Sequence, residues 1–471
     1  MNSFSPKSTQ SVTLIIASLA SFITPFISSA INVALPTIGN EFNANALTLS
    51  WVATSFLLSS AIFLVPFGRI ADIYGRKRIL NSGLVIYIFT TLLCAFAPNI
   101  TFLIAFRILQ GLGSAMIFGT GMAIVTSVFP KENRGKALGI VVSSVYAGLT
   151  LGPFIGGIIT QNLGWHNLFL LTIPLGLTSL FLSIFFLKGD WKESSGEKFD
   201  WKGSAIFALS ISSLMYGFSQ LPEATGIMLT TFGLLGLWLF IHFESTLRFP
   251  VINIQLFKEN RVFSYSNYAA LINYSATFAI GFLLSLYLQY VKNLNPQQAG
   301  QILVVQPLLM TLFSPLTGRL SDKINPGKVA SIGMAMLSGG LFFLSFINTS
   351  TSIYFIVPVL VIFGIGFALF SSPNTNAIMG SVEKKHYGIA SATLGTMRLV
   401  GQMFSMGIAM LLFSIFIGNV EINSSNSNAF VTSIRIAFLI FALLCFLGIF
   451  FSLARNKKKN KDDHSGGPKI S

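Results

Sequence analysis

The sequence predicts an all-α integral membrane protein that crosses the bilayer fourteen times. Its 471 residues are 53% hydrophobic and only 10% charged, and the mean hydropathy is +0.72. Because about 25% of the residues of a typical soluble domain are charged, this chain has too little charge to cover a soluble globule. Long apolar runs recur along it, and basic residues gather in alternate connections between them. These observations exclude soluble enzymes, disordered proteins and ordinary nucleic-acid binders.

The expected spans are apolar runs close to the roughly 20 residues that a helix needs to cross the hydrocarbon. They end at charged residues or at segments rich in Gly, Pro and Asn. The runs are 12–35, 49–71, 79–97, 102–128, 137–160, 167–187, 203–220, 226–244, 262–290, 298–320, 329–347, 353–372, 387–417 and 431–453. The first run lacks a small-residue cleavage site and many spans follow it, so we expect a retained helix.

Basic residues predict the orientation of these spans. With both termini in the cytoplasm, nearly all of the 30 lysines and arginines fall in cytoplasmic segments, and only Lys292 falls in an outer loop. Three more, Arg107, Arg398 and Arg435, lie within apolar runs. Because Lys and Arg concentrate in cytoplasmic loops, we expect a plasma-membrane protein with both termini inside. The net charge of +15 then needs no nucleic-acid partner.

The polar connections suggest two bundles of six spans with two spans inserted between them. We expect the first bundle over 1–187, a cytoplasmic linker with the inserted spans over 188–261, the second bundle over 262–454 and a basic cytoplasmic tail over 455–471. A short repeat supports the duplication, because GRIADIYGRKR at 68–78 and GRLSDKINPGK at 318–328 each follow the second span of a bundle. Transporter folds are often built from such duplicated halves.

The segment 68–78 predicts a gate on the cytoplasmic side. Glycines allow a tight turn, and an aspartate can cap a helix or pair with arginine across it. The gate residues are Gly68, Arg69, Asp72, Gly75, Arg76 and Lys77, with Asp322 in the second copy. The competing interpretation is ordinary basic loop charge, which does not account for the recurrence of the spacing.

Two further patterns lie within the spans. Arg107 stands in mid-span with Gln110 one turn later, and Arg398 lies in a later span. A guanidinium inside a membrane is costly, so it usually faces a cavity or a partner, although Arg107 could also reach the outer interface. The fifth span carries small residues at helical spacing that suit close helix packing, with a proline that bends the helix. They are Gly139, Gly148, Gly152, Pro153, Gly156 and Gly157.

These motifs resemble those of the major facilitator superfamily, within it the fourteen-span drug:proton antiporters of the multidrug efflux type. The resemblance rests on 68–78, on R-x-x-Q-G at 107–111, on the glycine pattern of the fifth span and on Asn-Val-Ala-Leu-Pro at 32–36. It covers nearly the whole chain. It implies the major facilitator fold, alternating access, and export of small amphipathic molecules driven by a proton gradient, with no cofactor.

One departure from that family concerns the charges of the cavity. The branch usually has an aspartate where this chain has Ile27, and no Asp or Glu lies in the interior of a predicted span. His166 and Glu223, both on the outer side, are weak substitutes for a proton-coupling acid. We therefore expect a neutral to positive cavity that suits neutral or anionic amphiphiles. Its expected polar lining is Ser28, Ser29, Asn32, Asn267, Asn273, Tyr274 and Gln306.

The sequence thus predicts a monomeric bacterial secondary exporter and no enzyme. There is no P-loop, metal-ligand spacing or catalytic set, and Cys94 and Cys445 lie in apolar runs. The expected partners are an amphiphilic small molecule and the lipid bilayer. Two alternatives stay open: an uncoupled facilitator or flippase for a lipid-like or anionic substrate, and a membrane sensor or scaffold that transports nothing.

Overall fold

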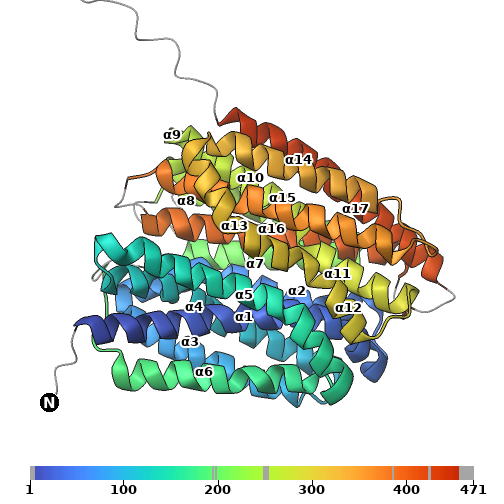
Figure 1. Cartoon of the computed structure of the whole chain (residues 1–471), viewed down its shortest axis with the longest axis horizontal. Helices are drawn as coiled ribbons and strands as arrows, with labels where there is room; N and C mark the ends of the chain where they lie inside the picture. Colours follow the sequence, from blue (N-terminus) through green and yellow to red (C-terminus); the bar gives the residue numbers. More distant parts are fainter. Residues whose placement is uncertain are drawn as a thin grey trace, which may run out of the picture.

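The computed structural model describes residues 6–193, 196, 199–247, 254–383, 387–418, 420–422 and 426–455. Within these ranges the chain is almost entirely helical and forms no strand. The helices run side by side along one axis (Figure 1). Such an arrangement suits a bilayer, because an α-helix satisfies its own backbone hydrogen bonds where water is absent.

The helices of the first half and of the insertion follow the expected order. They are α1 (Pro6–Phe42), α2 (Ala46–Tyr74), α3 (Arg76–Ala95), α4 (Ile100–Val128), α5 (Lys131–Leu163), α6 (His166–Phe186), α7 (Trp201–Gln220) and α8 (Ala224–Glu244). The second half holds α9 (Ile254–Glu259), α10 (Arg261–Thr277), α11 (Ala279–Leu286), η1 (Tyr287–Val291), α12 (Pro296–Leu303), α13 (Val305–Lys323), α14 (Pro326–Leu344), α15 (Ile353–Gly380), α16 (Tyr387–Phe416) and α17 (Ser427–Ala454).

Two of the expected spans are interrupted helices. The expected span 262–290 comprises α10, α11 and the π-helical turn η1, and 298–320 comprises α12 and α13. Counting each as one, 13 helical segments of the described chain are long and apolar enough to cross a membrane. The remaining expected span is α7, which is 20 residues long but rich in serine.

Helices α1–α6 and α10–α17 form two groups, with α7 between them in Figure 1. Helix α7 pairs with α8 and also packs against α2 and α16, one from each group. On the α16 side, the Phe218 ring lies against Gly407 and 6.4 Å from the Phe404 ring. On the α2 side, Tyr216 lies 6.2 Å from Trp51. The inserted pair therefore covers one side of the seam between the bundles.

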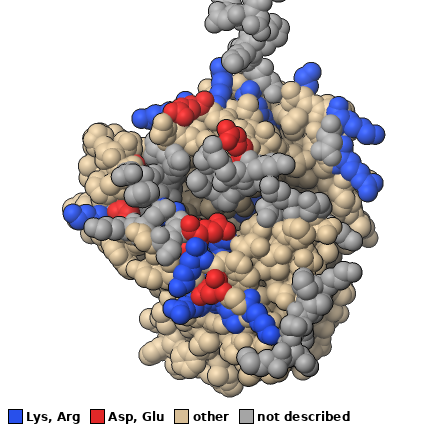
Figure 2. Space-filling model, turned by 90° about the vertical axis from the view of Figure 1, so that its left-hand side faces the viewer, with Lys and Arg blue, Asp and Glu red and all other residues tan. Residues whose placement is uncertain are grey.

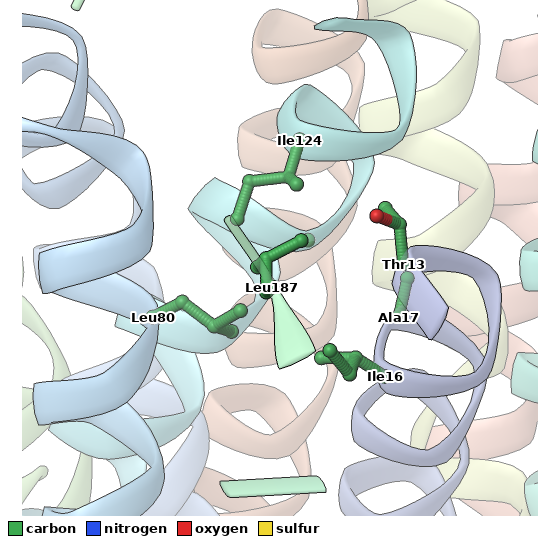
Figure 3. A pocket seen from close by; sticks show the side chains of 7 residues that line it. Thr13, Ile16, Ala17, Leu80, Ile124 and Leu187 are labelled. Carbon is green, nitrogen blue, oxygen red and sulfur yellow. The ribbon is translucent and has the colours of Figure 1, made fainter. Parts of the chain in front are cut away.

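Charged side chains gather at one end of the molecule, which we call the basic end. It holds the segment 68–78 and the connection after α6, and Figure 2 shows its lysines, arginines and carboxylates around a recess near the centre of the face. A small crevice lies inside the first bundle near this end (Figure 3). Six of its seven lining residues are apolar or glycine, and Thr13 is the exception. The crevice is too narrow for a water molecule, so it is a packing defect and no substrate site.

Candidate functional site

The seam between the bundles is closed in the half away from the basic end. Gly157 of α5 packs on the start of α12 so closely that a Cβ there would lie 2.5 Å from the Pro296 carbonyl oxygen. Gly300 of α12 meets the Pro153 carbonyl in the same way. Only glycine allows two backbones to approach so closely. Gly157 and Pro153 belong to the fifth-span pattern predicted from the sequence. We call their contacts with Pro296 and Gly300 of α12 the glycine seal.

Hydrogen bonds between α1 and the second bundle continue the seal. Ser285 Oγ donates to the Asn32 carbonyl at 2.6 Å, and Gln289 Nε2 donates to the Val33 carbonyl at 2.9 Å. Pro36 within α1 leaves a carbonyl without its usual helical donor. The Asn-Val-Ala-Leu-Pro segment therefore lies at the bundle interface and presents its backbone to α11 and η1.

The other glycines of the fifth-span pattern face α1 inside the first bundle. A Cβ on Gly148 would lie 2.5 Å from the Phe22 carbonyl, and one on Gly156 would lie 2.8 Å from the Ala30 Cβ. Gly152 packs on Ser29, whose hydroxyl donates to the Pro25 carbonyl at 2.9 Å. Gly139, nearest the basic end, has open space where a Cβ would be. Helix α5 is therefore tightly packed on α1 in the half away from the basic end, whereas near the basic end Ala137 and Val141 are buried and Gly139 is exposed.

A polar layer crosses the seam at the middle of the spans. Thr150 Oγ1 of α5 lies 2.9 Å from Thr311 Oγ1 of α13. One turn closer to the basic end, the Tyr146 hydroxyl lies 3.2 Å from Ser371 Oγ of α15. These contacts join the two bundles where a central substrate site would lie. Sequence reasoning missed Tyr146, Thr150 and Ser371, because hydroxyls also pack between helices and no spacing distinguishes the two roles.

Arg398 of α16 carries the positive charge of this central layer. Its Cζ lies 5.3 Å from the centroid of the Tyr274 ring, and its charge interacts with both Tyr274 and Tyr146. Its Nε is buried and has no hydrogen-bond partner. None of the described residues forms an ion pair with it. The central layer therefore carries a positive charge.

Arg107 and Gln110 lie elsewhere, within the first bundle. Arg107 is only 1% exposed, donates through Nε to the Val52 carbonyl at 3.1 Å and through Nη1 to Gln110 Oε1 at 2.6 Å, and lies over the Phe56 ring. Gln110 in turn donates to Thr91 Oγ1 at 2.7 Å. Arg107 does not reach the outer interface. The structure separates it from Arg398, so the three polar residues grouped from the sequence form two different sites.

The predicted gate is a network centred on Arg76. Its guanidinium contacts Asp72 Oδ1 at 2.8 Å, Glu193 Oε1 at 2.7 Å and Ser127 Oγ at 2.6 Å. The side chain is only 6% exposed, so these pairs lie partly out of water. They tie α2, α4 and the connection after α6 together. Glu193 was not predicted, because a carboxylate in a polar loop carries no signal of its own.

Other predicted gate residues also contact the connection after α6, which contains Asp190. Gly75 adopts φ of +124°, which a side chain would strain, and Asp190 occupies the space that its Cβ would need. The backbone N–H of Lys77 donates to Asp190 Oδ1 at 3.0 Å. Gly68 packs against Gly119 of α4. Arg69 makes contacts within the chain, and the side chain of Asp322 lies outside the described part of the structure.

Two buried charged residues at the basic end escaped the sequence analysis. Arg455, assigned to the basic tail, is 4% exposed and donates to Ser266 Oγ and Asn374 Oδ1 at 2.9 Å. Burial lowers the pKa of this guanidinium to about 10, so it stays charged at neutral pH. The rest of the tail, 456–471, lies outside the described residues. Glu244, placed at a loop edge, is 1% exposed and faces Asp200 across Gly203.

The predicted cavity lining is only partly at the seam. Tyr274 lies beside Arg398, and Asn32 lies at the contact of α1 with α11. Asn267 and Asn273 are fully buried, and Ser29 packs against α5. Ser28 and Gln306 are partly exposed. Asn267 Nδ2 donates to the Phe263 carbonyl of its own helix, and the Asn273 amide has no hydrogen-bond partner among the described residues.

Comparisons with known proteins agree with this architecture. The Major Facilitator Superfamily model matches residues 17–406 and 267–470. The riboflavin transporter RibZ of Clostridioides difficile is 31% identical over 96% of this chain and 98% of its own length. The multidrug resistance protein Stp of Mycobacterium tuberculosis (strain H37Rv) is 30% identical over 86% of this chain and 75% of its own length.

Solved structures show the same fold. A bacterial homolog of the human lysosomal transporter Spinster covers 95% of this chain and 97% of its own, with a TM-score of 0.67 and 14% identity. A structure of a proton-dependent oligopeptide transporter covers 95% and 98%, with a TM-score of 0.67 and 15% identity. The two helix bundles, the glycine seal and these matches agree: the chain belongs to the major facilitator superfamily and has its integral membrane fold.

Proposed function

We propose that this transporter exports small amphipathic molecules across the bacterial plasma membrane by alternating access, in exchange for protons. The observation that carries the proposal is the asymmetric seam. Glycine contacts and hydrogen bonds close it in the half away from the basic end, whereas Gly139 in the inner part of α5 has open space beside it. If basic residues face the cytoplasm, the seam is closed more tightly toward the outside than toward the cytoplasm.

The names of the relatives support the class of cargo. One is a riboflavin transporter and another a multidrug resistance protein. Both names point to small organic molecules, and riboflavin joins a flat aromatic ring system to a polar chain. Aromatic residues at the central layer, such as Tyr274 and Phe367 with centroids 6.3 Å apart, suit cargo of that kind.

Proton coupling requires a group that binds and releases a proton. Glu244 is the one carboxylate buried to this degree among the described residues, and it lies on α8 at the basic end. Helix α8 pairs with α7, which contacts both α2 and α16. A change of charge at Glu244 could therefore influence helices that border the seam. Glu244 joins His166, Glu223 and Asp72 as a residue to test for coupling.

Transport itself is tested with purified protein in proteoliposomes. Riboflavin and a panel of cationic, neutral and anionic amphiphiles are loaded on one side, and their movement is followed with and without an imposed proton gradient. We expect at least one to move faster than in protein-free liposomes and to accumulate when the gradient is imposed. Movement without gradient-driven accumulation supports the facilitator or flippase alternative, which the acid-free span interiors favour. No movement of any compound supports the sensor or scaffold.

A further inference from the structure

Arg398 differs from the other arginines that lie in or beside the spans. Arg107 donates to the Val52 carbonyl and to Gln110, and Arg455 donates to Ser266, Asn374 and Ser452. Arg435 donates through Nε to the Ser345 carbonyl at 3.1 Å. Arg398 instead has a buried Nε with no hydrogen-bond partner. Arg398 hydrogen-bonds the Tyr274 side chain, but no described carboxylate balances its charge. Both an unsatisfied buried donor and an unpaired charge within a span are costly.

The position of Arg398 fits a ligand site. It lies in the central part of α16, on the seam that Tyr146 of the first bundle and Ser371 of the second bridge at 3.2 Å. Its side chain is partly exposed, in contrast to the fully enclosed Arg107. The Tyr274 ring holds the guanidinium from one side at 5.3 Å. Among the described residues no carboxylate pairs with it.

We propose that Arg398 recognises the negative group of the substrate, and that this transporter carries small organic anions with an aromatic body. A guanidinium presents parallel N–H donors that match the two oxygens of a carboxylate or sulfonate. The hydroxyls of Tyr146 and Ser371 offer further donors, and Tyr274 with Phe367 forms an apolar wall. An anion also offsets the charge of an arginine buried in the membrane. This proposal rests on the transport function proposed above and names its substrate class.

The test measures equilibrium binding to the purified full-length protein, and then transport in proteoliposomes. The probes share a naphthalene body and differ in charge: the naphthalenesulfonate anion, the neutral naphthalenesulfonamide, and a naphthylmethyl trimethylammonium cation. The variants are R398Q, which removes the charge, and R398K, which keeps the charge but loses the paired donors. The matched control is R435Q, which removes an exposed arginine from the outer part of α17.

We expect the sulfonate to bind more tightly than the sulfonamide, and R398Q to weaken sulfonate binding by about tenfold to a hundredfold, as for a charge-assisted hydrogen bond. R398K should lie in between, and R435Q should bind like the wild type. Equal or undetectable binding of the sulfonate relative to the sulfonamide overturns the proposal, as does unchanged sulfonate binding in R398Q. Folding of each variant is checked by size-exclusion chromatography and thermal unfolding.

The transport measurement separates failure of this proposal from failure of the transport function. If the neutral or cationic probe is transported and R398Q transports it normally, the transporter works and the anion proposal is wrong. If the sulfonate binds through Arg398 but no probe crosses the membrane, the anion site stands and the proposed transport function fails.

Discussion

The seal between α5 and α12 can be opened by a single methyl group. A Cβ on Gly157 would lie 2.5 Å from the Pro296 carbonyl oxygen and 3.1 Å from the Gln297 Cα, both backbone atoms of the other bundle. Reaching an ordinary contact of about 3.4 Å requires the helices to separate by roughly 0.9 Å. Because backbone cannot rotate away as a side chain can, Gly157→Ala should destabilise the outward-closed state by about 1–3 kcal/mol. That free energy corresponds to a shift of about 5-fold to 150-fold in the closed-to-open ratio.

The shift can be measured by thiol accessibility. Ser285 is fully buried at the closed part of the seam, and cysteine is nearly isosteric with serine. The native Cys94 and Cys445 are both buried. In a Ser285→Cys background, the cysteine is labelled with an impermeant maleimide added from outside. Gly157→Ala should raise the labelling rate by about 5-fold to 150-fold. The control is Gly139→Ala on the same helix, where a Cβ meets nothing within 4 Å. Equal labelling rates in the two variants would refute the role of the glycine seal.

Three further variants test the other sites. Asp72→Asn removes a charged partner of Arg76, and we expect it to cut the transport rate at least tenfold while the protein stays folded. Normal transport would contradict the role of the Arg76 network as a gate. Arg107→Met leaves Gln110 Oε1 without its donor and removes the bond to the Val52 carbonyl. No charge stays buried, so we expect a loss of about 1–3 kcal/mol of stability, the cost of an unsatisfied buried acceptor, seen as a lower midpoint of thermal unfolding; a midpoint equal to wild type would argue against this structural role. Glu244→Gln should uncouple proton movement from substrate flux, and unchanged coupling excludes Glu244 as the proton site.

The fold was largely predictable because a bilayer imposes simple rules. Apolar length and basic residues located the spans, and the repeat at 68–78 and 318–328 indicated two related bundles. What was not predicted is where the expected spans break. The interruption at Phe278 falls inside apolar sequence and has no local signal. The one at Val304 lies just before Pro307, which has no N–H to donate to the Leu303 carbonyl, a signal that the sequence analysis did not use.

The site was predictable in its motifs but not in its geometry. Glycines at four-residue spacing indicated a close helix contact, and α1 and α12 are the helices that α5 meets there. The two arginines in mid-span looked alike in sequence, although Arg107 is satisfied within one bundle and Arg398 lies on the seam. Which face of a helix meets which neighbour is a tertiary property. Arg455 and Glu244 lie next to polar connections in the sequence, so nothing there indicated that the fold would bury them.

The central claim is exchange of substrate for protons, and the most direct measurement follows protons. Purified protein is reconstituted in proteoliposomes with a pH-sensitive dye inside, a proton gradient is imposed, and amphiphiles are added. The account predicts that a transported substrate triggers proton movement across the membrane, and that Glu244→Gln or Asp72→Asn abolishes it. Substrate flux with no accompanying proton movement would contradict the claim and leave an uncoupled facilitator or flippase.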